Sequence, residues 1–192
     1  MGRRPTFDAA QVITAARDVF WHSGFDGASL PEIEAATGLS RSSIYHAFTS
    51  KRGLFDAAVQ DYLDTVVAPR LALLRTDDGL DAYFASMRSE LDALDVDSPR
   101  RGCLLVTTAA TSAAHDETLA VVVNAYRTAL TEAFRGALTA RGDSDVETRS
   151  RILVTMSVGA LLQARVDRAE ALAVIDAARA LARGWESPVT TP

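Results

Sequence analysis

The chain has 192 residues, of which 48% are hydrophobic and 23% are charged. This composition excludes a disordered or collagen-like chain, and it allows either one sizeable core or a small module joined to a larger one. The sequence lacks the roughly 18 consecutive apolar residues of a membrane-spanning helix, and no apolar signal segment follows the basic pair Arg3-Arg4, so we expect a cytoplasmic protein with no membrane partner.

The formal net charge of -5 is unevenly distributed. Residues 1–54 carry six basic and five acidic side chains and have a net charge of +1, which leaves -6 for the remainder. A local basic patch in the first part is therefore compatible with the acidic total. Cys103 is the only cysteine, so the chain has no intrachain disulfide and no thiolate metal cluster, as expected in a reducing compartment.

Apolar residues recur every three or four positions along nearly the whole chain, and Ala, Leu, Arg and Glu are abundant. The sequence shows no alternating run bounded by turns that would indicate a β-strand. We therefore predict an all-α fold of about nine helices. They are expected at about residues 7–22, 29–37, 41–48, 50–74, 78–94, 103–113, 116–141, 145–166 and 169–184.

Capping residues mark the ends of the first three helices. Thr6 is the expected N-cap of the first helix, which Ser23-Gly24 ends. Ser29-Leu30-Pro31-Glu32 has the pattern of a capping box, with proline tolerated in the first turn. Gly38 provides a left-handed residue that stops the second helix, and Ser40 caps the third.

The fourth helix begins near Ser50-Lys51, and Pro69 marks a kink or a break in it. We place the domain boundary within this helix. The prediction is an N-terminal three-helix helix-turn-helix domain over residues 1–54 and a helical bundle domain over residues 55–192, linked by the helix at about 50–74.

Two short helices that are joined by a glycine-containing turn and packed on a preceding helix form the architecture that lays its second helix in the DNA major groove. The predicted helix 41–48 has side chains suited to that contact. Its exposed polar side chains, which can hydrogen-bond base edges, are Arg41, Ser42, Ser43 and His46. Its Tyr45 hydroxyl can reach a phosphate. Its apolar residues expected to face inward are Ile44, Ala47 and Phe48.

Lys51 is the only lysine in the chain, and it lies at the start of the fourth helix. A cation at this position opposes the positive end of the helix dipole, which is unfavourable unless an anion lies nearby. A DNA phosphate would supply that anion. The alternative is a solvated surface lysine.

These elements resemble the signature of the TetR family of transcriptional repressors. The matching residues lie within about 10–60: Gly24-Phe25, Ser29, Ile33, Gly38-Leu39-Ser40, Ile44-Tyr45, Phe48 and Ser50-Lys51-Arg52-Gly53-Leu54-Phe55. The chain departs from the family pattern at two places. Ser29-Leu30 stands where members usually carry two threonines, and Ala47 stands where they carry His or Tyr.

The resemblance implies a DNA-binding regulator, by default a repressor, that binds a palindromic operator in double-stranded DNA and is released by a small-molecule effector. Arg41, Ser42, Ser43 and His46 match positions that face bases, whereas Ser29, Tyr45, Lys51 and Thr6 match positions that hold phosphates. Arg3 and Arg4 form either an arm near the minor groove or a basic tail.

The two C-terminal helices have the apolar surface of a partner interface. Between Ile152 and Leu162 the predicted helix is almost uncharged around its whole circumference, so it needs two apolar neighbours. The last helix has an apolar stripe made of Ala171, Val174, Ile175, Ala178, Leu181, Ala182 and Trp185. The resemblance implies that the helices at about 145–166 and 169–184 pair with their copies in a homodimer. The alternative is an ordinary monomer core.

The middle helices are the expected effector site, because relatives of this fold bind small molecules there and helix bundles commonly contain pockets. The candidate lining residues are Tyr83, Phe84, Met87, Thr107, Thr111, Asn124 and Met156. They are apolar or neutral, which favours an uncharged or weakly polar organic effector, although each has the alternative of a plain core or solvated residue. Asn124 is expected to be a buried amide that needs a partner.

Three other interpretations stay open at this point. Cys103 follows two arginines that could stabilise a thiolate, so it is either a redox sensor or a buried structural cysteine. The protein could also be a TetR-fold ligand or partner module without DNA binding. An enzyme is disfavoured, because the three histidines lie far apart without metal-site spacing and the sequence has no phosphate-binding glycine loop. We expect no catalytic residue, metal or cofactor.

Overall fold

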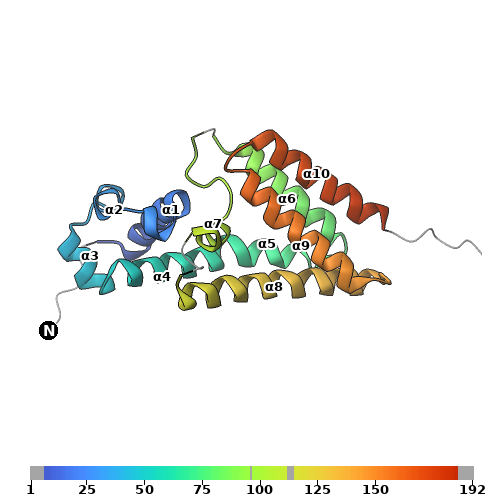
Figure 1. The fold of residues 1–192 in the computed structure, drawn as a ribbon, viewed down its shortest axis with the longest axis horizontal. Coiled ribbons are helices and arrows are strands. Elements are labelled where there is room, and N and C mark those ends of the chain that lie inside the picture. Colours follow the sequence, from blue (N-terminus) through green and yellow to red (C-terminus); the bar gives the residue numbers. More distant parts are fainter. Residues whose placement is uncertain (1–6, 96, 112–114, 186–192) are drawn as a thin grey trace, which may run out of the picture.

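The computed structural model describes residues 7–95, 97–111 and 115–185, and within these ranges every regular element is a helix (Figure 1). The elements are α1 (Ala9–Gly27), α2 (Leu30–Thr37), α3 (Arg41–Phe48), α4 (Lys51–Tyr62), the π-helical segment η1 (Leu63–Val67), α5 (Ala68–Leu73), α6 (Gly79–Ala93), α7 (Leu104–Thr111), α8 (Glu117–Arg141), α9 (Val146–Gln163) and α10 (Arg168–Gly184). Since α4, η1 and α5 follow one another directly, they form one rod, and the described ranges contain nine continuous helices. The predicted fold class is confirmed.

The helices form an elongated molecule with α1, α2 and α3 at one end and α6, α9 and α10 at the other (Figure 1). The rod from α4 to α5 and the long helix α8 run between the two ends. In the second part α10 packs against α6 and α9, and α9 packs against α8. Helix α7 contacts α1, α8 and α9, so it joins the two ends of the molecule.

The N-terminus of α1 differs from the sequence prediction. Asp8 caps this helix, because its carboxylate accepts a hydrogen bond of 2.9 Å from the amide of residue 10 and one of 3.4 Å from that of residue 11. The proposed cap, Thr6, lies outside the described residues, as do Arg3 and Arg4. The predicted end of the helix appears as a break at Gly24 (φ 71°, ψ 176°), after which the chain stays helical to Gly27.

Pro69 affects the rod through the turn before it. A proline inside a helix donates no hydrogen bond and crowds the carbonyl four residues earlier, here that of Thr65. The wider turn of η1 precedes it, with the amide of Ala68 donating to the carbonyl of Leu63. The sequence prediction of a kink or a break therefore corresponds to a π-helical turn in a rod that continues.

The buried side chains form one continuous hydrophobic cluster along the molecule. Phe20 and Phe55 meet edge to face at 5.0 Å between ring centroids in the first part, and Tyr83 and Phe134 do so at 5.0 Å in the second. The rod contributes to both parts of the core. The division into residues 1–54 and 55–192 stays a prediction. Among the described helices, none is long and apolar enough to cross a membrane.

Candidate nucleic-acid interface

The turn between α2 and α3 is built by the capping residues that the sequence indicates. The Ser29 hydroxyl oxygen accepts from the Glu32 amide at 3.3 Å, and the Glu32 carboxylate accepts from the Ser29 amide at 2.8 Å and from its hydroxyl at 2.7 Å. Gly38 ends α2 in the left-handed conformation (φ 68°, ψ 9°). The Ser40 hydroxyl oxygen then accepts from the Ser43 amide at 3.3 Å, which starts α3. These caps confirm the predicted helix-turn-helix geometry.

A second tight turn fixes α3 against the rod. Thr49 has a positive φ of 69°, and the Ser50 hydroxyl oxygen accepts from the Gly53 amide at 3.1 Å. The backbone is so close here that a Cβ on Gly53 would lie 2.0 Å from the Phe48 carbonyl oxygen. The buried side chain of Ile44 faces inward from α3. The position of α3 therefore depends on a turn that only glycine permits.

The outer face of α3 presents Arg41, Ser42 and His46 to solvent, with Ser43 and Tyr45 half-buried beside them. The guanidinium of Arg41 lies 5.3 Å from the centroid of the Tyr45 ring. This cation–π contact holds a donor-rich group and a phenolic hydroxyl together on one surface.

Ala47 also lies on the exposed side of α3, so the prediction that it faces inward is wrong. Ile44 is fully buried and Phe48 is half-buried. These two residues four positions apart form the whole inward stripe of a helix of eight residues. Ala47 is left outside that stripe.

Lys51 is half-buried at the first position of α4, and its Nζ lies 4.7 Å from the centroid of the Phe25 ring. Burial lowers the pKa of Lys51, while Asp26 and Glu32 act in the opposite direction. The cation therefore sits on an aromatic face at the positive end of a helix dipole. A phosphate beside it would stabilise the charge that burial disfavours.

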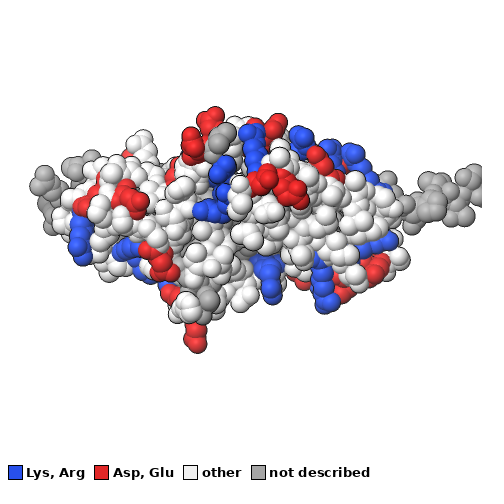
Figure 2. Space-filling view, turned by 45° about the horizontal axis from the view of Figure 1, so that its top comes forward, with Lys and Arg blue, Asp and Glu red and all other residues white. Residues whose placement is uncertain are grey.

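The surface around these groups has mixed charge. Arg52 forms ion pairs with Asp56 at 2.8 Å and Asp116 at 2.7 Å. Glu32 and Glu34 lie on α2, and the Glu34 carboxylate accepts a hydrogen bond from the Arg41 amide. Figure 2 shows basic and acidic side chains interspersed, also at the end of the molecule that carries α3. On the face that Figure 2 shows, contact with a polyanion would depend on a few placed side chains rather than on a broad basic field.

Comparisons with known proteins agree with this geometry. Residues 12–58 match the family of bacterial regulatory proteins, tetR family. The chain is 29% identical over 162 residues to the uncharacterized HTH-type transcriptional regulator YezE of Bacillus subtilis (strain 168), covering 80% of this chain and 84% of YezE. It is 38% identical over 76 residues to the HTH-type transcriptional repressor BdcR of Escherichia coli (strain K12), covering 40% of this chain and 39% of BdcR.

A solved structure decides the family. A cysteine mutant of the TetR family transcriptional regulator CifR, complexed with a 26-base-pair double-strand operator DNA, superposes with a TM-score of 0.79 at 31% identity, covering 96% of this chain and 100% of that chain. This chain belongs to the TetR family. It is a DNA-binding transcriptional regulator.

In this TetR-family chain, the residues predicted to contact DNA come from three adjacent places: the start of α2, the outer face of α3 and the start of α4. They are Ser29, Arg41, Ser42, Ser43, Tyr45, His46 and Lys51, and their contacts with DNA stay predictions. The capping-box pattern predicted that the Glu32 carboxylate accepts from the amide at the N-terminus of α2, and this is confirmed. No pattern in the sequence indicated that the Glu34 carboxylate accepts from the Arg41 amide at the start of α3.

Most of the residues predicted to line an effector site lie in the packed core or on the surface instead. Tyr83 and Phe84 are packed with Phe134 in an aromatic cluster, with the Tyr83 and Phe84 ring centroids 5.2 Å apart. Thr107 is buried, and its hydroxyl donates to the Cys103 carbonyl at 3.0 Å. Met156 is half-buried against the core, and Thr111 is exposed.

The prediction of a buried Asn124 is wrong, because Asn124 is exposed. Helix α8 buries the stripe Leu119, Tyr126 and Leu130, and Asn124 points away from that stripe. Met87 is the one candidate that lines the cavity of about 260 Å³ between α1, the rod, α6, α9 and α10.

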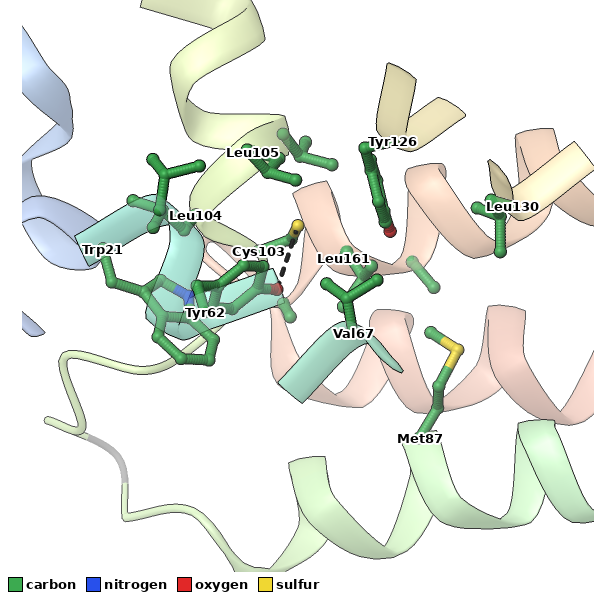
Figure 3. Close-up of a cluster of buried hydrophobic side chains, with 14 of the residues drawn as sticks. Trp21, Tyr62, Val67, Met87, Cys103, Leu104, Leu105, Tyr126, Leu130 and Leu161 are labelled. Atoms are coloured by element: carbon green, nitrogen blue, oxygen red, sulfur yellow. Dashed lines mark hydrogen bonds between the residues drawn. The ribbon is translucent and has the colours of Figure 1, made fainter. Parts of the chain in front are cut away.

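Cys103 lies in the core, with no exposed surface. The Tyr62 hydroxyl donates to its Sγ at 3.1 Å, and Leu105 and Tyr126 lie around it (Figure 3). Burial raises the pKa of Tyr62 well above its usual value, so the phenol keeps the proton that it donates. This environment favours a structural cysteine.

The two arginines that precede Cys103 have other partners. The Arg100 guanidinium forms a bidentate pair with Asp18 at 2.8 and 3.0 Å, and the Arg101 guanidinium donates to the Arg165 carbonyl at 3.5 Å. The activating role that the sequence allowed for them is therefore not supported by their contacts.

Proposed function

We propose that this TetR-family protein represses transcription by binding a palindromic operator as a homodimer, and that a small-molecule effector releases it. The observation that carries the proposal is the outer face of α3, where Arg41, Ser42 and His46 are exposed on a helix held by two capped turns. Guanidinium, hydroxyl and imidazole groups are suited to hydrogen bonds with base edges in the major groove.

The neighbouring groups fix the helix on the DNA backbone. The Tyr45 hydroxyl and the Lys51 ammonium would each contact a phosphate, and the half-buried position of both restricts their motion. Ser29 lies at the N-terminus of α2, where free amides favour an anion. Its hydroxyl already donates to Glu32, so a phosphate there would compete with that carboxylate.

The exposed apolar surface supports the homodimer. Ile152 and Leu162 on α9 are 36% and 48% exposed, Val166 just after α9 is 82% exposed, and Leu181 on α10 is 38% exposed. Ile152 and Gly159 are seven residues apart along α9 and so share one face of it, which a second copy would cover. Twofold symmetry would then place two α3 helices roughly 34–36 Å apart, the spacing of successive major grooves.

As a regulator of bacterial DNA the protein would act in the cytoplasm, and we assign it a regulatory rather than an enzymatic role. The effector would act by a change in the position of α4 that alters the spacing of the two α3 helices. This requires reciprocal coupling: an effector that weakens operator binding must itself bind less tightly to the operator complex.

Fluorescence anisotropy with the intergenic DNA upstream of the protein's own gene tests the proposal. We expect nanomolar binding that Arg41→Ala weakens by roughly 5- to 150-fold, because a bidentate base contact contributes about 1–3 kcal/mol. Arg75→Ala, which removes the same charge from the exposed turn after α5, is the control and should leave affinity unchanged. No binding at low salt would refute DNA binding and leave a ligand or partner module.

Light scattering on the same proteins tests the dimer. Leu162→Glu should convert a dimer into a monomer and weaken operator binding, because it places a charge in the apolar interface. Val121→Glu alters a side chain of 66% exposure on α8 and should leave the dimer intact. A native protein that is monomeric at micromolar concentration would refute this part of the proposal.

A further inference from the structure

The cavity of about 260 Å³ lies where the helix-turn-helix end meets the rest of the molecule. Its walls include Trp21 on α1, Met87 on α6 and Leu161 on α9, three side chains from distant parts of the sequence that all belong to the buried cluster in Figure 3. An engineered cavity of about 150 Å³ accepts benzene. By that comparison this cavity holds an organic molecule of roughly ten non-hydrogen atoms.

Three residues that line this cavity each have a buried N–H group without a hydrogen-bond acceptor. They are Arg17 and Arg70 at Nε and Trp21 at Nε1. Arg17 and Trp21 are 7% and 6% exposed. The Arg17 Nε lies 3.7 Å from the nearest Asp18 oxygen, beyond hydrogen-bond distance, and the Trp21 ring lies edge to face on Tyr62. Buried donors without acceptors are rare because each is costly, so three around one cavity need an explanation.

The rest of the wall is apolar on one side and basic on the other. Val66, Leu91 and Ile175 join Met87 and Leu161 as apolar surface. Arg100 joins Arg17 and Arg70 on the basic side, and each guanidinium pairs with a carboxylate, Arg100 with Asp18, Arg17 with Asp61 and Arg70 with Glu90. The wall therefore lacks acceptors for the Nε–H groups of Arg17 and Arg70 rather than counter-charges for them. An occupant that satisfies such walls has an apolar body and oxygen acceptors with negative charge at one end. Arginine recognises a carboxylate through paired hydrogen bonds.

We propose that this cavity binds a small carboxylic acid with an apolar body of roughly ten non-hydrogen atoms, with its carboxylate toward Arg17 and Arg70. The inference rests on the proposed function in one respect, because it names the chemical class of the effector. It departs from the uncharged effector that the sequence favoured, since the neutral candidates other than Met87 lie outside the cavity wall.

The cavity also connects the occupant to the DNA-binding end. Arg17 lies on α1, and its Nη1 donates to Asp61 on α4 at 2.7 Å and to Thr65 on η1 at 2.9 Å. A carboxylate that binds Arg17 adds a further anion to this link between α1 and the rod. Binding of the acid would therefore change the packing of α1 against α4 and, through α4, the position of α3.

Isothermal titration calorimetry on the full chain tests the chemistry with two matched pairs of probes: octanoate against 1-octanol, and phenylacetate against 2-phenylethanol. We expect at least one acid to bind tenfold or more tightly than its alcohol. Arg70→Gln should remove this preference, as should Arg70→Lys, which keeps the charge but has no Nε–H. Arg88→Gln is the control, since Arg88 on α6 pairs with Asp176 at the surface. A thermal melt checks that each variant is folded.

Equal binding of acid and alcohol, no binding of either acid, or an unchanged preference in both folded Arg70 variants would overturn the inference. Operator affinity without any probe is measured separately, so a failure of DNA binding is distinguished from a failure of the cavity assignment. If an acid binds with the expected preference but leaves operator affinity unchanged, the binding site stands and its role as the effector site is refuted.

Discussion

Substitution of Gly53 by alanine tests how the tight turn between α3 and α4 positions the DNA-binding helix. Alanine normally stabilises a helix by about 1 kcal/mol relative to glycine. Here its Cβ would lie 2.0 Å from the Phe48 carbonyl oxygen, which is backbone and cannot rotate away. Either α3 must move, or the first turn of α4 must open and lose the Ser50 cap at 3.1 Å.

The expected magnitude follows from these opposing effects. Overpacking costs about 1–3 kcal/mol and loss of the cap about 1 kcal/mol, while helix propensity returns about 1 kcal/mol. We therefore expect Gly53→Ala to lower the free energy of unfolding by about 1–3 kcal/mol. At roughly 2–4 °C per kcal/mol for a chain of this size, the Tm should fall by several degrees.

Gly136→Ala is the matched control for this prediction. Gly136 lies inside α8, and a Cβ there would meet no atom within 4 Å. That substitution should raise the free energy of unfolding by about 0.5–1 kcal/mol. Urea unfolding and operator titration of both variants give the comparison. If Gly53→Ala is as stable as Gly136→Ala and binds the operator normally, the turn does not position α3 as argued.

Three further outcomes are expected. Hydrogen bonds from Arg179 on α10 lower the pKa of Asp81 on α6. The pair therefore stabilises the fold at pH values above the ordinary carboxyl pKa, and this stabilisation is lost as the pH falls through the lowered pKa. Asp81→Asn should flatten the acid side of a plot of Tm against pH. Cys103→Ala should lower the free energy of unfolding by about 1–3 kcal/mol, because the buried Tyr62 hydroxyl loses its acceptor. Peroxide treatment of the native protein should leave operator affinity unchanged. Lys51→Gln should weaken binding to all DNA sequences alike and reduce the slope of log affinity against log salt by about 0.9, and an unchanged slope would exclude a phosphate contact.

The elements that could be predicted from sequence are those specified by local chemistry. The hydroxyls of Ser29, Ser40 and Ser50 cap helices within three residues of themselves, and Gly38 ends α2 through its own backbone conformation. Such features depend on neighbours in the sequence, so the sequence alone indicates them. The exposure of Arg41, Ser42 and His46 on α3 follows from the same register.

The features that escaped prediction depend on packing between distant segments. Asn124 and Ala47 face outward because their helices are covered on one side only. Apolar periodicity alone does not decide which residues lie on the covered side. No motif or spacing in the sequence singles out Arg17 or Arg70. Their place in one cavity wall arises from the contact of α1 and the rod with α6, α9 and α10.

Footprinting with a stoichiometric titration of the full chain on its upstream DNA is the most direct test of the central claim. We expect a protected palindrome with two half-sites roughly one helical turn apart, saturated by two chains and bound about 10³-fold or more tightly than unrelated DNA. Arg41→Ala should weaken the protection of both half-sites equally. Uniform protection without a palindrome, or saturation by one chain, would refute operator binding as a homodimer.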